Sequence, residues 1–128
     1  MDNMAYVVRS DRSFDEVSER LEKAMPDNNF RVLAVHNVKD TLAEKGFDID
    51  SLKIYEVCNA GFAYKAIQSD VNVAMFMPCK IVVRPDGGGS RMTLVRPSMI
   101  AEMLPGAGLN DLAEEVEKQL KGILDEVK

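Results

Sequence analysis

The spacing of apolar residues alternates along the chain between short runs typical of strands and the wider period typical of helices. Runs rich in β-branched and aromatic residues predict five strands, at residues 4–9, 30–35, 52–58, 79–84 and 91–95. Apolar residues that recur every three or four positions predict four helices, at residues 13–25, 37–46, 59–70 and 110–127. Two further segments are expected to be an extended stretch at 73–77 and a short helical turn within 97–104.

Polar residues that cap helix N-termini stand where each of the four helices is expected to begin. Ser13 and Glu16 have the spacing of a capping box, in which a hydroxyl accepts a hydrogen bond from an amide three residues later. Asn37, Asn59 and Asn110 occupy the same place before the other three helices. These caps support the helix starts independently of the apolar periodicity.

The order of elements is β-α-β-α-β-α-β-β-α, and the glycine-rich segment 85–90 predicts a hairpin between the last two strands. Each helix has a single apolar stripe, which indicates that helices cover one sheet. We therefore expect an α+β fold with a single mixed or antiparallel sheet, covered mainly on one face. The stripe of the C-terminal helix, 110–127, suits either the chain's own sheet or a second subunit, so a homodimer through it or through an uncovered sheet face is one expectation.

Composition limits the classes of protein to which the chain can belong. A chain of 128 residues with 46% hydrophobic and 29% charged residues fits one globular domain, 1–128. Acidic and basic residues are interspersed at a net charge of −5, without the basic stripe that binds phosphates, so we expect no nucleic-acid partner. No apolar run is long enough to span a bilayer. No secretory signal stands at the N-terminus, so we expect a cytoplasmic protein.

The two cysteines are the main candidates for chemistry. Cys58 ends a predicted strand just before the Asn59 cap, and Cys79 follows Met77 and Pro78 at the start of another strand. A helix N-terminus next to Cys58 favours the reactive thiolate. The two thiols could form a redox pair, supply half of a metal site, or be two small core residues. In the cytoplasm a permanent disulfide is not expected, whereas a transient one is compatible with the sequence.

The relative direction of the two strands decides whether the two cysteines can form a pair. If the strands are parallel neighbours, six residues at about 3.3 Å each put the cysteines roughly 20 Å apart, and a pair is excluded. If they are antiparallel, the end of one strand meets the start of the other. A disulfide or a shared ligand then still needs Cα atoms within about 7 Å.

Metal binding and acid–base catalysis have weaker signals. Met75, Met77 and Cys79 would project to one face of an extended segment, and soft ligands of this kind suit Cu(I), but a buried strand has the same spacing. Two cysteines and one histidine are too few for a closed zinc site, so we expect no metal and no cofactor. His36, at a strand end, could serve as a general base, although no nucleophile stands near it in the sequence.

Two stretches carry a resemblance to a known family. The first runs from Cys58-Asn59 into Phe62-Ala63-Tyr64-Lys65-Ala66, and the second is Met77-Pro78-Cys79-Lys80-Ile81-Val82-Val83. Together with the strand at 30–32, the helix end at 42–46 and the acidic, glycine-containing hairpin, they resemble the domain of unknown function 302 family over residues 4–95. In that family the helix usually opens with proline, where this chain has Ala60-Gly61.

The resemblance implies a small α+β domain, found mainly in bacteria and archaea, without an established activity. Some members are encoded near sulfur-handling proteins. Our first functional hypothesis is a non-catalytic domain that binds a small molecule or a protein partner. Its pocket would be shaped by Cys58, Asn59, Met77, Pro78 and Cys79. The alternatives are a thiol-dependent sulfur-handling or redox accessory protein that uses both cysteines, and an enzyme that uses His36.

Overall fold

An antiparallel sheet of five strands forms the centre of the structure, a computed structural model that describes residues 4–128. The strands are β1 (Ala5–Ser10), β2 (Arg31–Asn37), β3 (Lys53–Cys58), β4 (Cys79–Asp86) and β5 (Gly89–Val95). Their order across the sheet is β1-β5-β4-β3-β2, so the N-terminal strand and β2 form the two edges. Every neighbouring pair is antiparallel, and β4 and β5 form the predicted hairpin.

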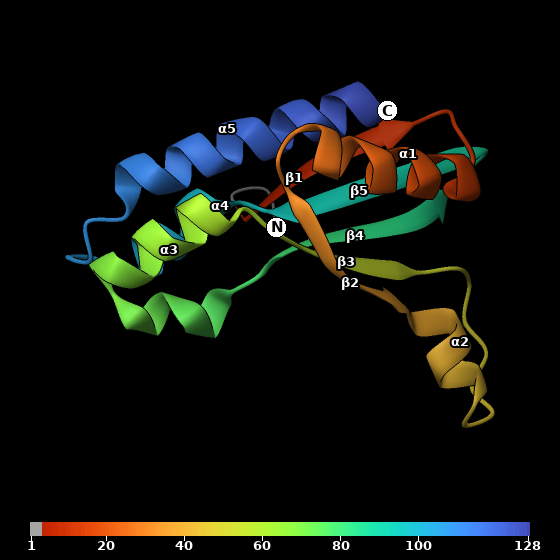
Figure 1. Ribbon diagram of the computed structural model, residues 1–128. Coiled ribbons are helices and arrows are strands. Elements are labelled where there is room, and N and C mark those ends of the chain that lie inside the picture. The colour runs from red at the N-terminus through yellow and green to blue at the C-terminus, as the bar shows by residue number, and fades with distance from the viewer. Residues whose placement is uncertain (1–3) are drawn as a thin grey trace.

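Six helical segments connect and cover the strands (Figure 1). They are α1 (Phe14–Asp27), α2 (Val38–Ala43), α3 (Ala60–Ser69), the 3₁₀ helix η1 (Val71–Phe76), α4 (Pro97–Met103) and α5 (Asn110–Val127). Helices α1 and α5 lie on the same side of the sheet, whereas α2 projects away from it beyond β2 and β3. Within residues 4–128, no helix combines the length and the apolar character needed to cross a membrane. The predicted α+β class is confirmed, and the predicted order of elements is roughly that of the structure, which adds η1 and α4 to it.

Three of the predicted helix caps are present. The Ser13 hydroxyl accepts a hydrogen bond from the Glu16 amide at 3.1 Å, and the side chain of Asn37 caps α2 in the same way. Asn59 Oδ1 accepts from the Phe62 amide at 3.1 Å and starts α3. These bonds satisfy amides that have no partner inside the helix, which is why short local patterns predicted the helix starts correctly.

The hydrophobic core lies between one face of the sheet and helices α1 and α5. Inward-facing residues of the central strands, such as Tyr55, Ile81 and Met92, are fully buried there. The apolar stripe of α5 packs into the same core through Val116, Leu120, Ile123, Leu124 and Val127. The C-terminal helix therefore covers the chain's own sheet, and its stripe is not free for a second subunit.

The opposite face of the sheet is open. Strand registers place Val7 beside Thr93, Thr93 beside Val82 and Val82 beside Ile54, in a row that crosses four strands on this face. Val7 exposes 49% of its surface, whereas Val8, the next residue along the strand, is 5% exposed in the core. Alternation of side chains along each strand thus separates a buried face from a face that no helix within residues 4–128 covers.

Two local predictions were wrong. Residues 73–77 are not extended, because 71–76 form the 3₁₀ helix η1, which the Asp70 side chain caps by accepting from the Asn72 amide at 2.9 Å. Asn110 is not a cap, because it is the first residue of α5 and Leu109 precedes it without a side-chain cap bond. Leu109 is 4% exposed in a small apolar cluster, so its burial, and not a polar cap, positions the start of α5.

Candidate functional site

An apolar cavity of about 90 Å³ lies where β3 and β4 meet helices α3, η1, α4 and α5. Its lining is formed by Phe30, Val57, Cys58, Asn59, Phe62, Ala63, Ala66, Val73, Phe76, Met77, Pro78, Cys79, Pro97, Ile100, Ala101, Leu109, Leu112, Ala113 and Val116. Only Asn59 among them has a strongly polar side chain. The cavity can therefore hold an apolar group, and it offers few hydrogen bonds to anything else.

The five residues predicted to shape a pocket all line this cavity. Cys58 and Asn59 stand at the junction of β3 and α3, and Met77, Pro78 and Cys79 form the entry into β4, with a cis peptide bond before Pro78. Asn59 is held in place from two sides, because it caps α3 and its Nδ2 donates to the Asn29 carbonyl at 3.1 Å. Two hydrogen bonds to backbone groups thus fix the Asn59 side chain at the edge of the cavity.

The two thiols do not form a pair, although their strands have the arrangement that a pair requires. Strands β3 and β4 are antiparallel, and the residue opposite Cys79 is Val57, one position before Cys58. Because side chains alternate along a strand, this register directs Cys79 to the core face and Cys58 to the other face. Both cysteines are free. A disulfide also needs Cβ atoms that point toward each other, which this register does not provide.

Cys79 lies in a poor environment for thiolate chemistry. Burial is the main cause that raises the pKa of its thiol to about 11; the charge of a Cys58 thiolate acts in the same direction and Lys80 in the opposite direction. Cys79 also packs against the main hydrophobic core. At neutral pH a thiol with this raised pKa is mostly protonated, which lowers its reactivity as a nucleophile.

The proposed row of soft metal ligands does not exist. Met75 lies in η1 and is 71% exposed, whereas Met77 packs on the small apolar cluster around Val73 and Cys79 on the main core. A row of alternate residues requires an extended segment, and the 3₁₀ turn removes it. Across residues 4–128, no three His, Cys, Asp or Glu side chains gather in an arrangement able to hold a metal ion.

His36 lies away from the cavity, on the open face of the sheet. Its Nε2 is 2.6 Å from Glu56 Oε1, and Lys80 Nζ is 3.6 Å from Glu56 Oε2. The hydrogen bond from His36 is the main cause that lowers the pKa of Glu56. Sequence reasoning missed this cluster because it depends on the registers that place β2 and β4 on either side of β3. His36 thus belongs to a surface network of polar contacts with Glu56 and Lys80.

Several cavity residues were not anticipated from the sequence. Pro97, Ile100 and Ala101 come from α4, and Ala113 and Val116 come from α5. They lie beyond the region 4–95 on which the family resemblance rested. Their apolar spacing in two helices was a visible signal, but nothing in it showed that these helices approach the β3–α3 junction.

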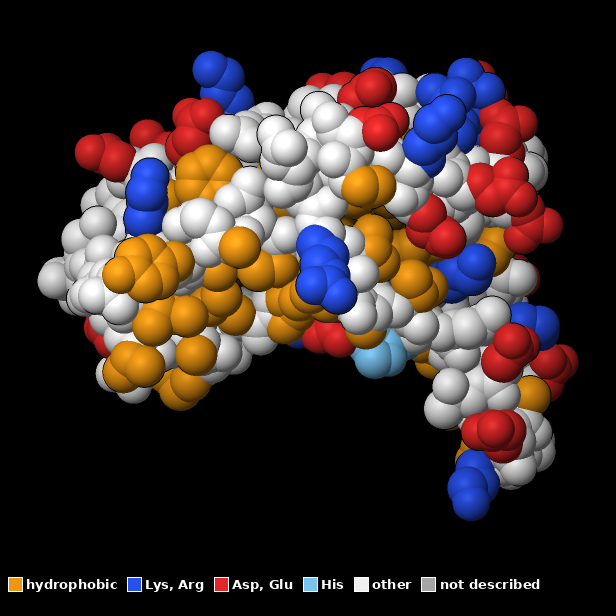
Figure 2. Space-filling view, viewed as in Figure 1, with side chains coloured by type: hydrophobic (Ala, Val, Ile, Leu, Met, Phe, Trp, Pro, Cys, Tyr) orange, Lys and Arg blue, Asp and Glu red, His pale blue; other side chains and the backbone are white. Residues whose placement is uncertain are grey.

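Exposed apolar side chains surround this part of the molecule. Figure 2 shows apolar side chains gathered over α3 and η1. Tyr64 and Ile67 of α3 are 66% and 38% exposed, and Val71 and Met75 of η1 are 67% and 71% exposed. Both segments also contribute to the cavity lining. The cavity and the exposed apolar surface are therefore built on the same two segments, and large exposed apolar patches commonly mark binding surfaces.

Comparison with known proteins gives one consistent result. The sequence pattern of the domain of unknown function DUF302 matches residues 6–127. The structure is similar to the crystal structure of an uncharacterised conserved DUF302 protein from Bacillus stearothermophilus, with a TM-score of 0.91 and 32% sequence identity over 98% of each chain. No curated protein matches the chain. The match extends past the region 4–95 to include α4 and α5, and the chain belongs to the DUF302 family.

Proposed function

We propose that the protein binds a small apolar ligand, or the apolar end of a larger molecule, in the cavity between β3, α3, η1, α4 and α5, and that it catalyses no reaction there. The observation that carries the proposal is the cavity itself, about 90 Å³ in volume with an almost wholly apolar lining. Cys58, Asn59, Met77, Pro78 and Cys79 act in it as wall residues and not as reactive groups.

The size of the cavity indicates the size of the ligand. A single water molecule needs about 10–15 Å³ by the same measure, but apolar cavities stay dry because they offer water no hydrogen bonds. An engineered cavity of about 150 Å³ holds benzene. A cavity of about 90 Å³ therefore suits a group smaller than a benzene ring, such as a short branched or linear hydrocarbon.

The exposed side chains of α3 and η1 supply a place for the remainder of a longer ligand. Tyr64, Ile67, Val71 and Met75 stand on the segments whose other residues line the cavity. A longer ligand that inserts its apolar end into the cavity could lay its remainder on this surface. Burial of apolar area contributes about 25 cal/mol per Å², so this contact would add to the affinity.

The alternative function, thiol-dependent sulfur handling or redox chemistry with Cys58 and Cys79, has less support. The strand register directs the two side chains to opposite faces, and burial raises the pKa of Cys79 to about 11. An enzyme based on His36 has less support still, because the His36–Glu56 contact lies on the open face, away from the cavity.

Xenon binding tests the proposal, because xenon enters small apolar cavities and needs no hydrogen-bond partner or charged group there. We expect xenon NMR to report saturable binding, with the largest protein shifts at the Met77 methyl group and at residues of α3. Ala66→Leu fills the cavity from α3 and should abolish binding. Ala60→Leu is the matched control, because Ala60 is exposed on the same helix and does not line the cavity.

Equal xenon binding by wild type and Ala66→Leu would contradict the proposed site, provided that the variant unfolds at a similar temperature. If Ala60→Leu also lost binding, the effect would belong to helix α3 in general and not to the cavity.

A homodimer remains part of the proposal. It would use the open sheet face, because the stripe of α5 is buried within the chain. A cytoplasmic location and the lack of a nucleic-acid partner remain predictions from the sequence.

A further inference from the structure

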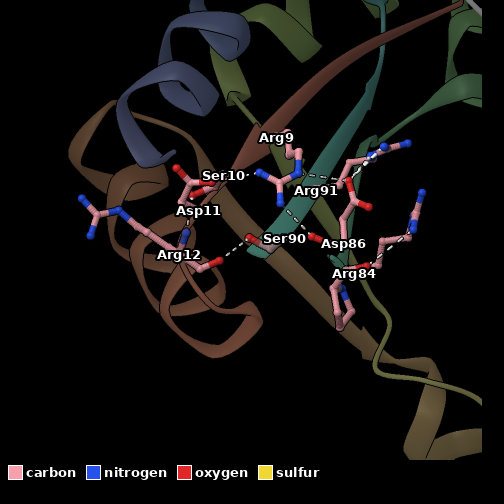
Figure 3. A network of polar contacts seen from close by, with 9 residues as sticks. Arg9, Ser10, Asp11, Arg12, Arg84, Asp86, Ser90 and Arg91 are labelled. Carbon is pink, nitrogen blue, oxygen red and sulfur yellow. Dashed lines mark hydrogen bonds and ion pairs between the residues drawn. The ribbon is translucent and has the colours of Figure 1, made fainter. Parts of the chain in front are cut away.

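Three arginines occupy paired positions in three neighbouring strands, at the hairpin end of the open sheet face. Arg9 of β1 is opposite Arg91 of β5, and Arg91 is opposite Arg84 of β4. The strand neighbours of Arg91 are buried, at 0% for Ser90 and 0% for Met92, so alternation directs the arginine row to the open face. Figure 3 shows this row with Asp86 among the three side chains.

Two carboxylates neutralise the row unevenly. Asp86 Oδ2 accepts from Arg91 Nε at 3.0 Å and lies 2.9 Å from Arg91 Nη2, while Arg9 Nε is 3.6 Å from the same oxygen. Arg9 also donates to Asp11 at 2.9 Å. Within residues 4–128, the Arg84 guanidinium makes a single hydrogen bond, which Nη1 donates to the carbonyl of Pro85 at 3.5 Å. Its guanidinium therefore has no acidic partner in the described part of the chain.

The arrangement carries an excess of positive charge in an otherwise acidic protein. The chain has a net charge of −5, yet three cations here share the two carboxylates of Asp11 and Asp86. Like charges at directly opposed positions of a sheet repel each other. An anion between Arg84 and Arg91 would relieve that repulsion. Arginine suits this task, because its planar fork of N–H donors matches the oxygens of phosphate.

We propose that Arg84 and Arg91 bind a phosphate group, either as inorganic phosphate or as the phosphomonoester of a small molecule. Asp86 fixes the guanidinium of Arg91 through Nε and Nη2, which leaves its Nη1 for the ligand. Arg84 supplies its own unpaired donors from the adjacent strand. The site lies on the open face, separate from the apolar cavity, and does not depend on the function proposed for that cavity.

Two-dimensional NMR of the arginine Nε–Hε groups tests the proposal in the intact chain. Inorganic phosphate and adenosine monophosphate are titrated separately at constant ionic strength, with sodium chloride as the reference. We expect saturable shifts at Arg84 and Arg91. Arg84→Gln should weaken phosphate binding about tenfold, as expected when a charge-assisted hydrogen bond is lost. Tighter binding of adenosine monophosphate indicates a phosphomonoester, and equal binding indicates inorganic phosphate.

Arg31→Gln is the matched control, because Arg31 is an exposed arginine of β2 with no acidic partner within residues 4–128. It should bind phosphate as the wild type does. Arg84→Lys keeps the charge without the fork and should bind with intermediate affinity. Three results would overturn the proposal: no saturable shift, an equal response to chloride, or equal weakening by Arg31→Gln and Arg84→Gln.

Discussion

Glu117 of α5 caps helix α4 from outside it, through Ser98. Its Oε1 accepts from the Ser98 amide at 3.1 Å and from the Ser98 hydroxyl at 2.6 Å. Helix α4 has no side-chain cap of its own at Arg96, so this carboxylate supplies the missing acceptor. Because Pro97, Ile100 and Ala101 line the cavity, the contact also positions one of its walls.

This contact predicts acid sensitivity. Burial acts to raise the pKa of Glu117, but hydrogen bonds from Ser98, Lys121 and Arg96 outweigh it and lower the pKa from 4.5 to about 2. A carboxyl whose pKa is lower in the folded state contributes stability above its unfolded value and loses it as pH falls. We expect the free energy of unfolding to drop by roughly 2–3 kcal/mol between about pH 4.5 and pH 2 from this group. Urea unfolding at a series of pH values measures it.

Glu117→Gln is the variant for this test, because it keeps the size of the side chain and removes the titration. It should be less stable than the wild type at pH 7, and the two curves should converge as the pH approaches 2. Glu115→Gln serves as the control, since Glu115 is exposed on the same helix. A Glu117→Gln protein with the same loss of stability in acid as the wild type would disprove the assignment.

A second polar contact, which is partly buried, joins the sheet to α1. The Tyr55 hydroxyl donates to Glu22 Oε2 at 2.6 Å, and burial followed by this hydrogen bond raises the pKa of Tyr55. The ring is fully buried, so Tyr55→Phe keeps the packing and removes only the hydroxyl. We expect a loss of about 1.5–3 kcal/mol in urea unfolding at neutral pH, the usual range for a hydrogen bond to a charged acceptor.

Tyr64→Phe is the control for that measurement, because the Tyr64 side chain is largely exposed. Its hydroxyl lies in solvent, so the substitution should change the free energy of unfolding by less than about 0.5 kcal/mol. Equal effects of the two substitutions would show that the Tyr55–Glu22 bond contributes nothing specific.

The features predicted correctly from the sequence are those decided within a few residues. Ser13, Asn37 and Asn59 cap helices by bonds to amides three positions later, so a short window contains the whole interaction. The same holds for the glycine-rich hairpin between β4 and β5. At the start of α5, local preference and tertiary packing disagree. The sequence predicts a polar cap at Asn110, but the burial of Leu109 in an apolar cluster with residues from other segments sets where the helix begins.

The candidate site illustrates the same limit. That Cys58 and Cys79 stand near one junction was visible in the sequence, but the one-residue offset that sends them to opposite faces is a property of the β3–β4 register. The His36–Glu56 contact likewise depends on the pairing of β2 with β3. A register is set by the whole sheet and its buried face, and a single strand does not contain that information.

Thiol labelling tests the assignment of Cys79 as an inert wall residue. In a Cys58→Ser variant the only remaining thiol is Cys79, whose pKa burial raises to about 11. We expect slow reaction with a thiol-specific reagent at pH 7, faster reaction as the pH rises toward 11, and rapid reaction in urea. The Cys79→Ser variant gives the matched measurement for Cys58. Rapid labelling of native Cys79 at neutral pH would contradict the assignment and would revive the redox alternative.

Gly89 permits the close approach of β1 to the β4–β5 hairpin. A Cβ atom at Gly89 would lie 2.0 Å from the Ser10 carbonyl oxygen, whereas one at Gly88 would have no neighbour within 4 Å. The contact at Gly89 is with backbone, which cannot rotate away as a side chain does. We therefore expect Gly89→Ala to destabilise the protein by about 1–3 kcal/mol in urea unfolding, the range seen when an interior is overpacked. Gly88→Ala is the control and should have little effect.

In hydrogen exchange, Gly89→Ala should weaken protection of the β1 amides before those of β3, because β1 is the strand displaced. Uniform loss of protection across the sheet, or equal stability of the two variants, would argue against this role of Gly89.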